Sequence, residues 1–465
     1  MISAVEFQNF PNIQTGNSLI DEYGHNDINL EGENGRSVRI SRKDPQMMSS
    51  VLEKYRINII ASDIIPLNRM VPDSRPVGCM KKIYPDDLPR TSIVIPFYDE
   101  WPSVLLRTVY SIINRTPRHL IQEIILVDDN SQIEKLKTAL DSYVKRNFPR
   151  GLVKVIHSPT REGLIKARLR GWKASTGEVI AFFDSHMEVN IDWLQPLLTA
   201  IKNDRKTIAM GMLDYINMNN FEYHFSEGYF VRYGFDWRLV FFEAYFRPDQ
   251  SGPSIEDPRP GTVMVGPAFA VDSKYFGEIG AYDDGMKIWG GENLEFPWRT
   301  MDVGDLSERL AIKEKLKCKN FTWYIANVWP ELNVFDQDAL AWGSVRNIQT
   351  NKCLDNHNHL FNYPQLLFDE ICTHKLAAQG FSWTKDHLLR SSLQCVVVKE
   401  MKDGEKPKLE DCVTGPRDEW EHVKGSYLKH VKSHLCLEHD GKELVMHKCN
   451  TTNERQHWLF SHYTI

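Results

Sequence analysis

The sequence predicts an α/β domain with a doubly wound, mostly parallel sheet, followed by a small all-β domain of three repeated units. Between about residues 91 and 184, apolar strand patterns alternate with helical patterns, which is typical of parallel sheets with right-handed crossovers. Acidic residues directly follow two of these strands. After about residue 345 the alternation stops, and three weakly similar units of about 40 residues follow, each with one pair of cysteines.

The first domain is expected to contain four strands and the helices that connect them. Runs rich in β-branched and apolar residues predict strands, and apolar residues three or four positions apart predict helices. The expected strands are residues 91–97, 123–129, 153–157 and 178–183. The expected helices run through Leu105, Leu106, Val109 and Ile113, and then over residues 132–147 and 164–174.

The fourth strand ends abruptly in Asp184-Ser185-His186. Ligands of open α/β sheets bind beyond the carboxyl ends of the strands, so Asp184 and His186 are expected at the mouth of a crevice. A carboxylate oxygen and an imidazole nitrogen two residues apart suit a divalent metal such as Mn²⁺, which could hold a diphosphate. The alternative is a strand-end aspartate that caps the next turn, beside a histidine with no ligand role.

Two other segments are candidates for the same site. The second strand ends in Asp128 and Asp129, where a nucleotide-sugar and its metal would bind, although capping of the following helix explains Asp128 equally well. In Trp289-Gly290-Gly291-Glu292-Asn293, paired glycines allow the backbone to approach a ligand closely. We favour a binding site for this segment over a simple turn.

The composition bears on the class of protein and its partners. A formal net charge of −6 indicates no strongly basic face, so nucleic acid is not an expected partner. No stretch reaches the roughly 18 apolar residues that a membrane helix needs, and the N-terminus lacks the basic and then apolar pattern of a signal peptide. Residues 1–47 are polar, and we expect them to be disordered.

Six of the eight cysteines lie in the C-terminal part of the chain. They form three couples separated by 19, 17 and 13 positions, which suggests three small disulfide loops. Sequons at Asn114, Asn320 and Asn450 permit N-glycosylation. Together these features favour the lumen of the secretory pathway. The couples are Cys353 with Cys372, Cys395 with Cys412, and Cys436 with Cys449.

Further motifs occur in a fixed order along the chain. They are Ala61-Ser62-Asp63-Ile64, Leu105-Leu106-Arg107-Thr108, Ile125-Leu126-Val127-Asp128-Asp129, Arg161-Glu162-Gly163-Leu164, Asp184-Ser185-His186, Phe235-Asp236-Trp237, Trp289-Gly290-Gly291-Glu292-Asn293-Leu294-Glu295, Gly304-Asp305-Leu306-Ser307-Glu308-Arg309 and Cys318-Lys319. From about residue 48 to the C-terminus, the chain resembles the polypeptide N-acetylgalactosaminyltransferase family.

The resemblance implies a GT-A glycosyltransferase domain over residues 48–340 and a ricin-type β-trefoil lectin domain over residues 341–465. Enzymes of this family transfer GalNAc from UDP-GalNAc to Ser or Thr of proteins in the Golgi, retaining the anomeric configuration. They usually carry an N-terminal membrane anchor, which is not visible here. By position, the resemblance implies Asp184 and His186 as ligands of Mn²⁺, and Glu292 and Asn293 as catalytic residues. It implies that the substrate and nucleotide are contacted by Asp129, Arg161, Asp184, Ser185 and Trp289. It also implies a disulfide between Cys79 and Cys318.

The chain departs from the family after Leu294-Glu295. There the family continues with a cysteine pair, a Val-Gly-His segment that supplies the third metal ligand, and a mobile loop that covers UDP. Here residues 296–303 lead directly to Gly304, so a sizeable block is absent. Tyr98 also replaces a family histidine, and Pro267 removes an N–H that could serve a ligand. The missing ligand and lid should cost more than the roughly 10–100-fold of outer-sphere changes.

The lectin-type units depart from the family as well. Only the third unit keeps Gln456-His457-Trp458, whereas the first unit reads Phe381-Ser382-Trp383. A sugar-binding unit of this family uses an aspartate after Cys-Leu. Asp355 fits that position, with His374 after the second cysteine of its unit, while the third unit has Glu438. Any binding of GalNAc is therefore expected in the first unit, and a purely structural trefoil is the alternative.

We therefore expect a polypeptide N-acetylgalactosaminyltransferase-like protein whose transferase activity is weak or lost. Its expected partners are UDP-GalNAc, with Mn²⁺ as cofactor, and Ser/Thr-rich polypeptides or GalNAc-glycopeptides. The alternative is a catalytically inactive pseudoenzyme that binds peptide, glycopeptide or a partner transferase.

Overall fold

The computed structural model describes residues 31–39, 45–226, 231–236, 239, 241–246, 254, 256–286, 288, 290–293, 321–357, 365–373, 376–413 and 415–464. The chain divides into two compact units. The first comprises Met1–Tyr229 and Met264–Lys317, and the second comprises Phe230–Val263 and Cys318–Ile465.

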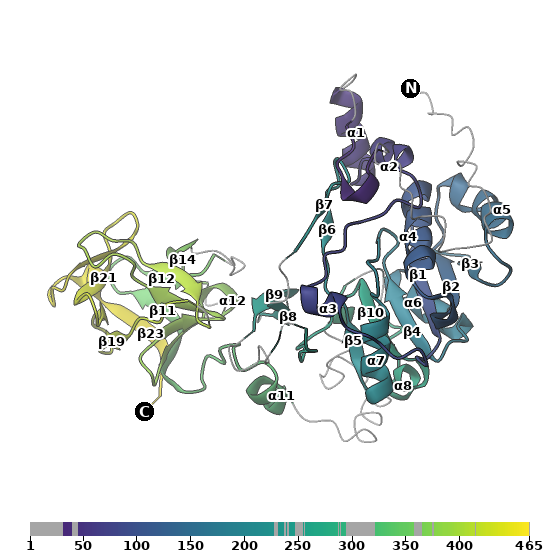
Figure 1. The fold of residues 1–465 in the computed structure, drawn as a ribbon. Coiled ribbons are helices and arrows are strands. Elements are labelled where there is room, and N and C mark those ends of the chain that lie inside the picture. The colour runs from purple at the N-terminus through teal and green to yellow at the C-terminus, as the bar shows by residue number, and fades with distance from the viewer. Residues whose placement is uncertain are drawn as a thin grey trace. The chain divides into compact units, whose positions relative to one another are not determined.

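A six-stranded sheet forms the centre of the first unit, in the order β3-β2-β1-β4-β10-β5 (Figure 1). β1, β2, β3 and β4 are mutually parallel neighbours, whereas β10 runs antiparallel to both β4 and β5. The strands are β1 Thr91–Phe97, β2 Ile121–Asp128, β3 Val153–His157, β4 Val179–Phe183, β5 Ile208–Met210 and β10 Ala268–Asp272. The doubly wound, mostly parallel sheet is thus confirmed, with one antiparallel strand inserted.

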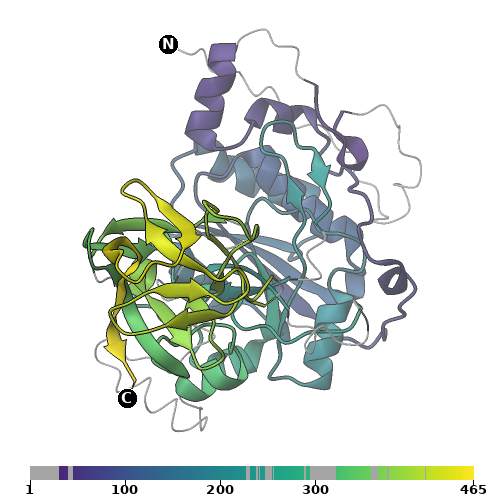
Figure 2. The same ribbon diagram turned by 90° about the vertical axis from the view of Figure 1, so that its left-hand side faces the viewer.

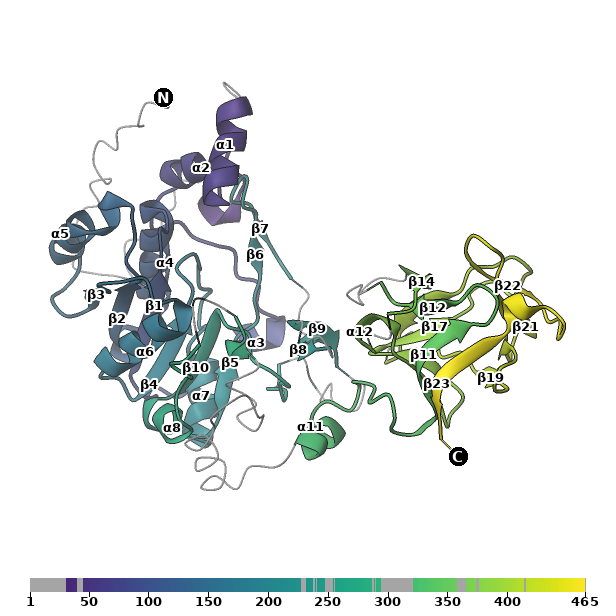
Figure 3. The same cartoon turned by 180° about the vertical axis from the view of Figure 1, so that it is seen from behind.

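Helices cover both faces of this sheet (Figures 2 and 3). Alternate strand residues point to opposite faces. Ile93 and Ile95 pack in one apolar core with residues of α4, α5 and α7, and Val94 packs in another with residues of α6 and α8. The helices are α4 Pro102–Arg115, α5 Thr138–Asn147, α6 Leu164–Ala174, α7 Gln195–Asn203 and α8 Ser273–Glu278.

The N-terminal segment 31–39 belongs to the folded first unit. Glu33 and Val38 are buried, and the Glu33 carboxylate accepts the Met70 N–H at 2.8 Å. Order therefore begins before the expected boundary at residue 48, because this polar segment hydrogen-bonds to the rest of the unit. The remaining elements of the first unit are η2 Glu33–Gly35, α1 Pro45–Tyr55, α2 Ile59–Ile64, α3 Val77–Met80, η3 Arg118–Leu120, η4 Glu134–Leu136, β6 Tyr215–Ile216 and β7 Tyr223–His224.

The second unit contains more of the chain than the expected lectin domain. Arg232 and Glu331 form a buried ion pair at 2.7 Å, and the fully buried Trp329 donates from Nε1 to the Phe235 carbonyl at 3.1 Å. The described residues between 231 and 263 and between 321 and 340 thus contact one another, and Asn333 and Glu331 also hydrogen-bond to Ser382 and Arg390 of the lectin-type part. These segments carry β8 Val231–Phe235, β9 Phe241–Tyr245 and α11 Phe321–Asn327.

Among its described residues, the C-terminal part of the second unit consists of short strands and two helical turns, α12 and η7 (Figure 3). Its three repeats share one apolar core, in which Leu354, Val396 and Leu437 occupy the position after the first cysteine of each couple. Its elements are β11 Ala339–Asn347, β12 Lys352–Asp355, β13 Gln365–Leu366, β14 Phe368–Ile371, α12 Leu376–Gln379, β15 Phe381–Thr384, β16 Leu389–Ser391, β17 Gln394–Val397, β18 Lys408–Asp411, β19 Trp420–His422, β20 Leu428–His430, β21 Leu435–His439, β22 Leu444–Lys448, η7 Glu454–Gln456 and β23 Trp458–Tyr463.

All three expected local disulfides are present in these repeats. They join Cys353 to Cys372, Cys395 to Cys412 and Cys436 to Cys449. The expected pairing of Cys79 with Cys318 is not tested, because Cys318 lies outside the described residues. None of the helices in the described part of the chain has the length and apolarity that a bilayer crossing requires.

Candidate functional site

The candidate site lies at the carboxyl edge of the sheet in the first unit. The strand order reverses direction between β1 and β4, since β2 and β3 continue on the far side of β1. Ligands of open α/β sheets bind at such a switch point. Asp129, Asp184 and His186 all follow strands that end at this edge, so the structure brings together the strand-end residues that the sequence singles out.

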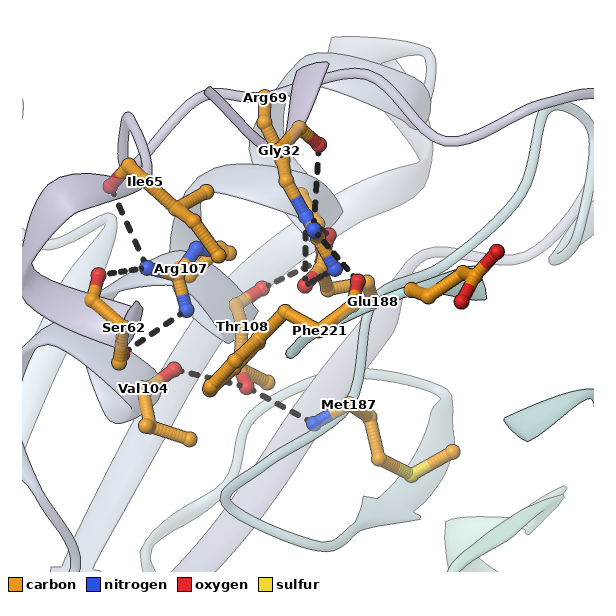
Figure 4. A network of polar contacts seen from close by, with 12 residues as sticks. Gly32, Ser62, Ile65, Arg69, Val104, Arg107, Thr108, Met187, Glu188 and Phe221 are labelled. Carbon is orange, nitrogen blue, oxygen red and sulfur yellow. Dashed lines mark hydrogen bonds and ion pairs between the residues drawn. The ribbon is translucent and has the colours of Figure 1, made fainter. Parts of the chain in front are cut away.

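Helix α4 holds the segment that carries Asp184 and His186. The Thr108 hydroxyl donates to the Ser185 carbonyl at 3.0 Å and accepts the Met187 N–H at 2.9 Å. Two residues after His186, the buried Glu188 forms an ion pair with Arg69 at 2.8 Å (Figure 4). Because its backbone is fixed on both sides of His186, this loop presents its side chains from a rigid frame.

Glu100 is a site residue that the sequence analysis missed. Its carboxylate oxygen Oε2 accepts the Ser185 hydroxyl at 2.8 Å and lies 2.8 Å from His186 Nδ1. Such a carboxylate fixes the ring so that Nδ1 carries the proton and Nε2 remains for a metal. Its position three residues after β1, at the same sheet edge, is the sequence signal that could have identified it.

The same contact raises the basicity of His186. Desolvation of the ring opposes protonation, but the hydrogen bond and charge of Glu100, with the charge of Asp184, raise the pKa of His186 to about 9. The contact with His186 also lowers the pKa of Glu100, against the effect of its desolvation. A cation that binds His186 must therefore displace a proton, so its affinity should increase with pH.

The Asp129 carboxylate accepts two hydrogen bonds from the backbone. Its two oxygens accept the N–H groups of Glu162 and Gly163, each at 2.8 Å. Gly163 adopts a φ of 98° and pairs with Ile288, and the Leu164 N–H donates to the Ile288 carbonyl at 2.8 Å. Asp129 thus fixes the turn at Glu162 and Gly163, and this turn pairs with Ile288, which shortly precedes Gly290 and Gly291. A direct contact between Asp129 and a nucleotide stays a prediction.

The Arg161 side chain stacks on Tyr98. The guanidinium carbon lies 3.6 Å from the centre of the Tyr98 ring, which is close for a cation–π contact. Arg161 is exposed, and Tyr98 directly follows β1. The contact with the ring holds the guanidinium at the sheet edge, where it can donate hydrogen bonds to an anionic ligand.

Arg168 is the second site residue that the sequence analysis missed. It is fully buried on α6, donates to the Gly266 carbonyl at 2.6 Å, and lies 3.4 Å from Asp184 Oδ1 and 3.9 Å from Glu292 Oε1. One cation therefore links the expected metal ligand to the expected catalytic carboxylate. No local pattern in α6 distinguishes Arg168 from other helix arginines, so only the packing identifies it.

Glu292 and Asn293 carry buried polar atoms without partners. Glu292 is 2% exposed, and its Oε2 atom and Asn293 Oδ1 have no hydrogen-bond partner in the described part of the chain. A Cβ added to Gly266 would lie 3.0 Å from Asn293 Oδ1 and 3.3 Å from Glu292 Oε1, so a glycine keeps this approach open. Buried polar atoms of this kind require an explanation, and a bound polar ligand supplies one. Trp289 lies outside the described residues.

His157, at the end of β3, links the sheet edge to α5. Its Nδ1 lies 2.8 Å from Asp128 and its Nε2 lies 3.2 Å from Asp141. Desolvation alone would lower its pKa, but hydrogen bonds and charges of Asp128 and Asp141 raise the pKa of His157 overall.

The raised pKa of His157 predicts a pH-dependent contribution to stability. A folded-state pKa above the unfolded value gives stabilisation that is fully present below the unfolded pKa and is lost as pH rises through the folded one. We therefore expect His157→Gln to destabilise the first unit more at about pH 5.5 than at about pH 9. Thermal unfolding of both proteins checks this result, with His119→Gln as the exposed control. An equal difference at both pH values would contradict the prediction.

The lectin-type site of the first repeat is built around Asp355. Its Oδ2 accepts the Gln379 amide at 2.9 Å, and its Oδ1 accepts the His357 N–H at 2.6 Å. Gln379 Oε1 accepts the Thr373 N–H at 2.8 Å. His374, the other predicted sugar contact, lies outside the described residues.

The third repeat contains the same arrangement of hydrogen bonds. There Gln456 donates to Glu438 and accepts the Asn450 N–H, each at 2.8 Å. Gln379 therefore corresponds to Gln456, and Gln379-Gly380-Phe381 corresponds to Gln456-His457-Trp458. The expected correspondence with Phe381-Ser382-Trp383 is wrong by two positions, because Phe381 rather than Trp383 occupies the fully buried core position.

Comparisons with known proteins agree with this architecture. Residues 92–280 match the model of glycosyl transferase family 2, and residues 341–458 match the ricin-type beta-trefoil lectin domain. Polypeptide N-acetylgalactosaminyltransferase 13 of Homo sapiens is 36% identical, with 93% of this chain and 89% of the relative covered. Polypeptide N-acetylgalactosaminyltransferase 11 of Xenopus tropicalis is 33% identical over 89% of this chain and 83% of the relative.

A solved structure of a similar protein has the same fold. The crystal structure of GalNAc-T7 with UDP, GalNAc and Mn²⁺ superposes with a TM-score of 0.68 at 26% identity, covering 94% of this chain and 93% of that chain. The sequence match to the human relative runs over 507 aligned positions, more than the 465 residues of this chain, so the relative carries residues within the matched span that this chain lacks. On these matches, the chain belongs to the polypeptide N-acetylgalactosaminyltransferase family.

Proposed function

We propose that this protein binds UDP-GalNAc with Mn²⁺ at the carboxyl edge of β1 and β4, and transfers GalNAc to Ser or Thr of proteins only weakly or not at all. The main support for the binding of UDP-GalNAc is the buried group formed by Arg168, Glu292 and Asn293 beside Asp184. Its unpartnered oxygens lie where a sugar hydroxyl could donate to them.

The donors at the sheet edge fit Mn²⁺. Asp184 supplies a carboxylate oxygen, and His186 supplies Nε2 because Glu100 occupies Nδ1. When bound there, Mn²⁺ would supply positive charge to offset the negative charge of a departing diphosphate. Arg161 would position the nucleotide from its place on Tyr98, and Glu292 and Asn293 would orient the sugar.

The proposed weakness of transfer follows from the donor count. In the described part of the chain no group of three or more His, Cys, Asp or Glu side chains forms a metal site. By the resemblance to the family, the third histidine and the lid segment are expected to be missing after Glu295, and the longer matched span of the human relative supports such an internal gap. A cation held by two protein ligands should bind less tightly and be poorly shielded from water.

Titration calorimetry with UDP, in the presence and absence of Mn²⁺, tests this proposal. We expect metal-dependent binding that Asp184→Asn removes, because the carboxylate is one of only two proposed ligands. Glu134→Gln is a matched control, since its side chain is 84% exposed. Transfer to Ser/Thr-rich peptides should be slow or undetectable in the same preparation. Equally tight binding of UDP without metal would refute the proposed metal site. Rapid transfer to the peptides would refute the proposed weakness of transfer.

A second candidate function is non-catalytic binding of peptide, glycopeptide or a partner transferase. The observation that favours it is the intact polar frame of Asp355 and Gln379 in the first repeat. We expect Asp355→Asn to weaken binding of a GalNAc-glycopeptide, measured by calorimetry, because an amide cannot accept both existing hydrogen bonds with the same strength. Glu438→Gln is the matched change in the third repeat and should leave binding unaltered. Equal effects of the two changes would contradict a site in the first repeat.

We propose a Golgi or other secretory-pathway lumen as the location. The three disulfides of the second unit support it, since such bonds persist in oxidising compartments. Detection of these bonds by mass spectrometry in protein from unreduced cells checks the location.

A further inference from the structure

We propose that Asn450 carries an N-linked glycan in the mature protein. Its sequon, Asn450-Thr451-Thr452, directly follows Cys449 of the third-repeat disulfide. The sequence alone does not choose among the three sequons of the chain. Accessibility and local conformation separate two of them, and the third, at Asn320, lies outside the described residues.

The Asn450 sequon is exposed and has an open amide. All three of its residues are exposed and lie in a turn outside any strand or helix. Asn450 Oδ1 accepts the Thr452 N–H at 3.0 Å and the Thr452 hydroxyl at 2.8 Å, which forms an Asx-turn. Asn450 Nδ2 has no hydrogen-bond partner among the described residues. The nucleophilic atom is thus free, while the hydroxyl that defines the sequon is held against the same amide.

The backbone of Asn450 is fixed although its side chain is open. Its N–H donates to the buried Gln456, and its carbonyl accepts the Asn453 N–H at 3.0 Å. The disulfide to Cys436 holds the preceding residue. A bulky group on Nδ2 can therefore extend into solvent without disturbing the fold around it.

The sequon at Asn114 has the opposite properties. Asn114 lies in helix α4, and both polar atoms of its side chain are buried without a hydrogen-bond partner in the described part of the chain. Thr116 is 2% exposed, and its hydroxyl accepts the Trp193 indole N–H at 2.8 Å. A glycan at Asn114 would have no space in the folded first unit, so this residue should be unmodified in folded protein.

The modification is a glycosyl transfer from a lipid-linked oligosaccharide diphosphate in the secretory pathway. A bond forms between Asn450 Nδ2 and C1 of the first sugar, and the bond between C1 and the diphosphate oxygen breaks. The lipid diphosphate leaves with the electron pair, and the amide loses one proton. The step requires only that the chain enter the lumen, which its three disulfides support.

The test is expression of the full chain behind a cleavable secretion signal in eukaryotic cells. Enzymatic release of N-glycans in ¹⁸O-water, followed by peptide mass spectrometry, marks each formerly occupied asparagine. We expect occupancy at Asn450 and none at Asn114. Asn450→Gln and Thr452→Ala should each abolish the signal at this position, while Thr451→Ala, which leaves the sequon intact, should retain it.

A C-terminal tag with its own sequon reports that each chain reached the lumen. Secreted protein with an occupied tag but an unmodified Asn450 would overturn the proposal. Occupancy at Asn114 in folded, secreted protein would overturn the accessibility argument on which it rests. Because the experiment does not measure nucleotide binding or transfer, its failure leaves the proposed transferase function untouched.

Discussion

Replacing Arg168 with methionine is expected to lower the free energy of unfolding of the first unit by about 3–5 kcal/mol. Arg168 is fully buried, and its removal leaves Glu292, which is 2% exposed, without its nearest described cation. The Gly266 carbonyl would also lose a hydrogen bond of 2.6 Å. Urea unfolding followed by tryptophan fluorescence measures the change.

A double-mutant cycle separates loss of charge pairing from loss of packing. Glu292→Gln alone should destabilise the unit, because Arg168 then lacks one carboxylate. The double variant should recover part of the loss of Arg168→Met, since neither charge remains buried alone. Additive effects, within about 0.5 kcal/mol, would show that the 3.9 Å pair is not coupled. Calorimetry on the folded fraction should also show weaker UDP binding, as Asp184 loses a neighbour that fixes it.

Gly163→Ala should cost about 3 kcal/mol or more and should abolish metal-dependent binding of UDP, because backbone strain and steric overlap add. Gly163 has a φ of 98°, and a Cβ there would lie 2.3 Å from the Ile288 carbonyl oxygen and 2.4 Å from Ile288 Cα. Backbone atoms cannot move aside as flexible side chains can. The substitution should therefore separate the turn capped by Asp129 from the segment that leads to Glu292.

Gly151→Ala is the matched control for this prediction. Gly151 has a φ of 84°, but a Cβ there would have no atom within 4 Å. It should therefore cost only the conformational strain of about 1–2 kcal/mol and leave UDP binding unchanged. If the two variants had equal stability, the contact with Ile288 would not matter. Thermal unfolding and titration calorimetry on both variants provide the measurements.

Much of the fold could be predicted from local patterns. The strand over residues 91–97 agrees with the bounds of β1, because a run of β-branched and apolar residues forms a buried strand wherever it lies. The helix expected over residues 132–147 instead begins with η4 and continues as α5 from Thr138, since Lys137, with ψ of −128°, interrupts the helix. The first lectin repeat departs from the expected alignment because its core position holds Phe381 where the other repeats hold tryptophan.

The residues of the candidate site could also be predicted only in part. Local sequence patterns are enough to place Asp184 and His186 after a buried strand, Asp129 at the end of another, and Glu292 and Asn293 after paired glycines, because strand ends and glycine turns are local features. The partners of these side chains depend on how distant segments of the chain fold together. Glu100 reaches His186 because β1 and β4 are adjacent, and Arg168 reaches Asp184 and Glu292 because α6 packs against the sheet with Arg168 next to Phe182 of β4. Such contacts join residues up to 124 positions apart, and no local period encodes which chain segments become neighbours.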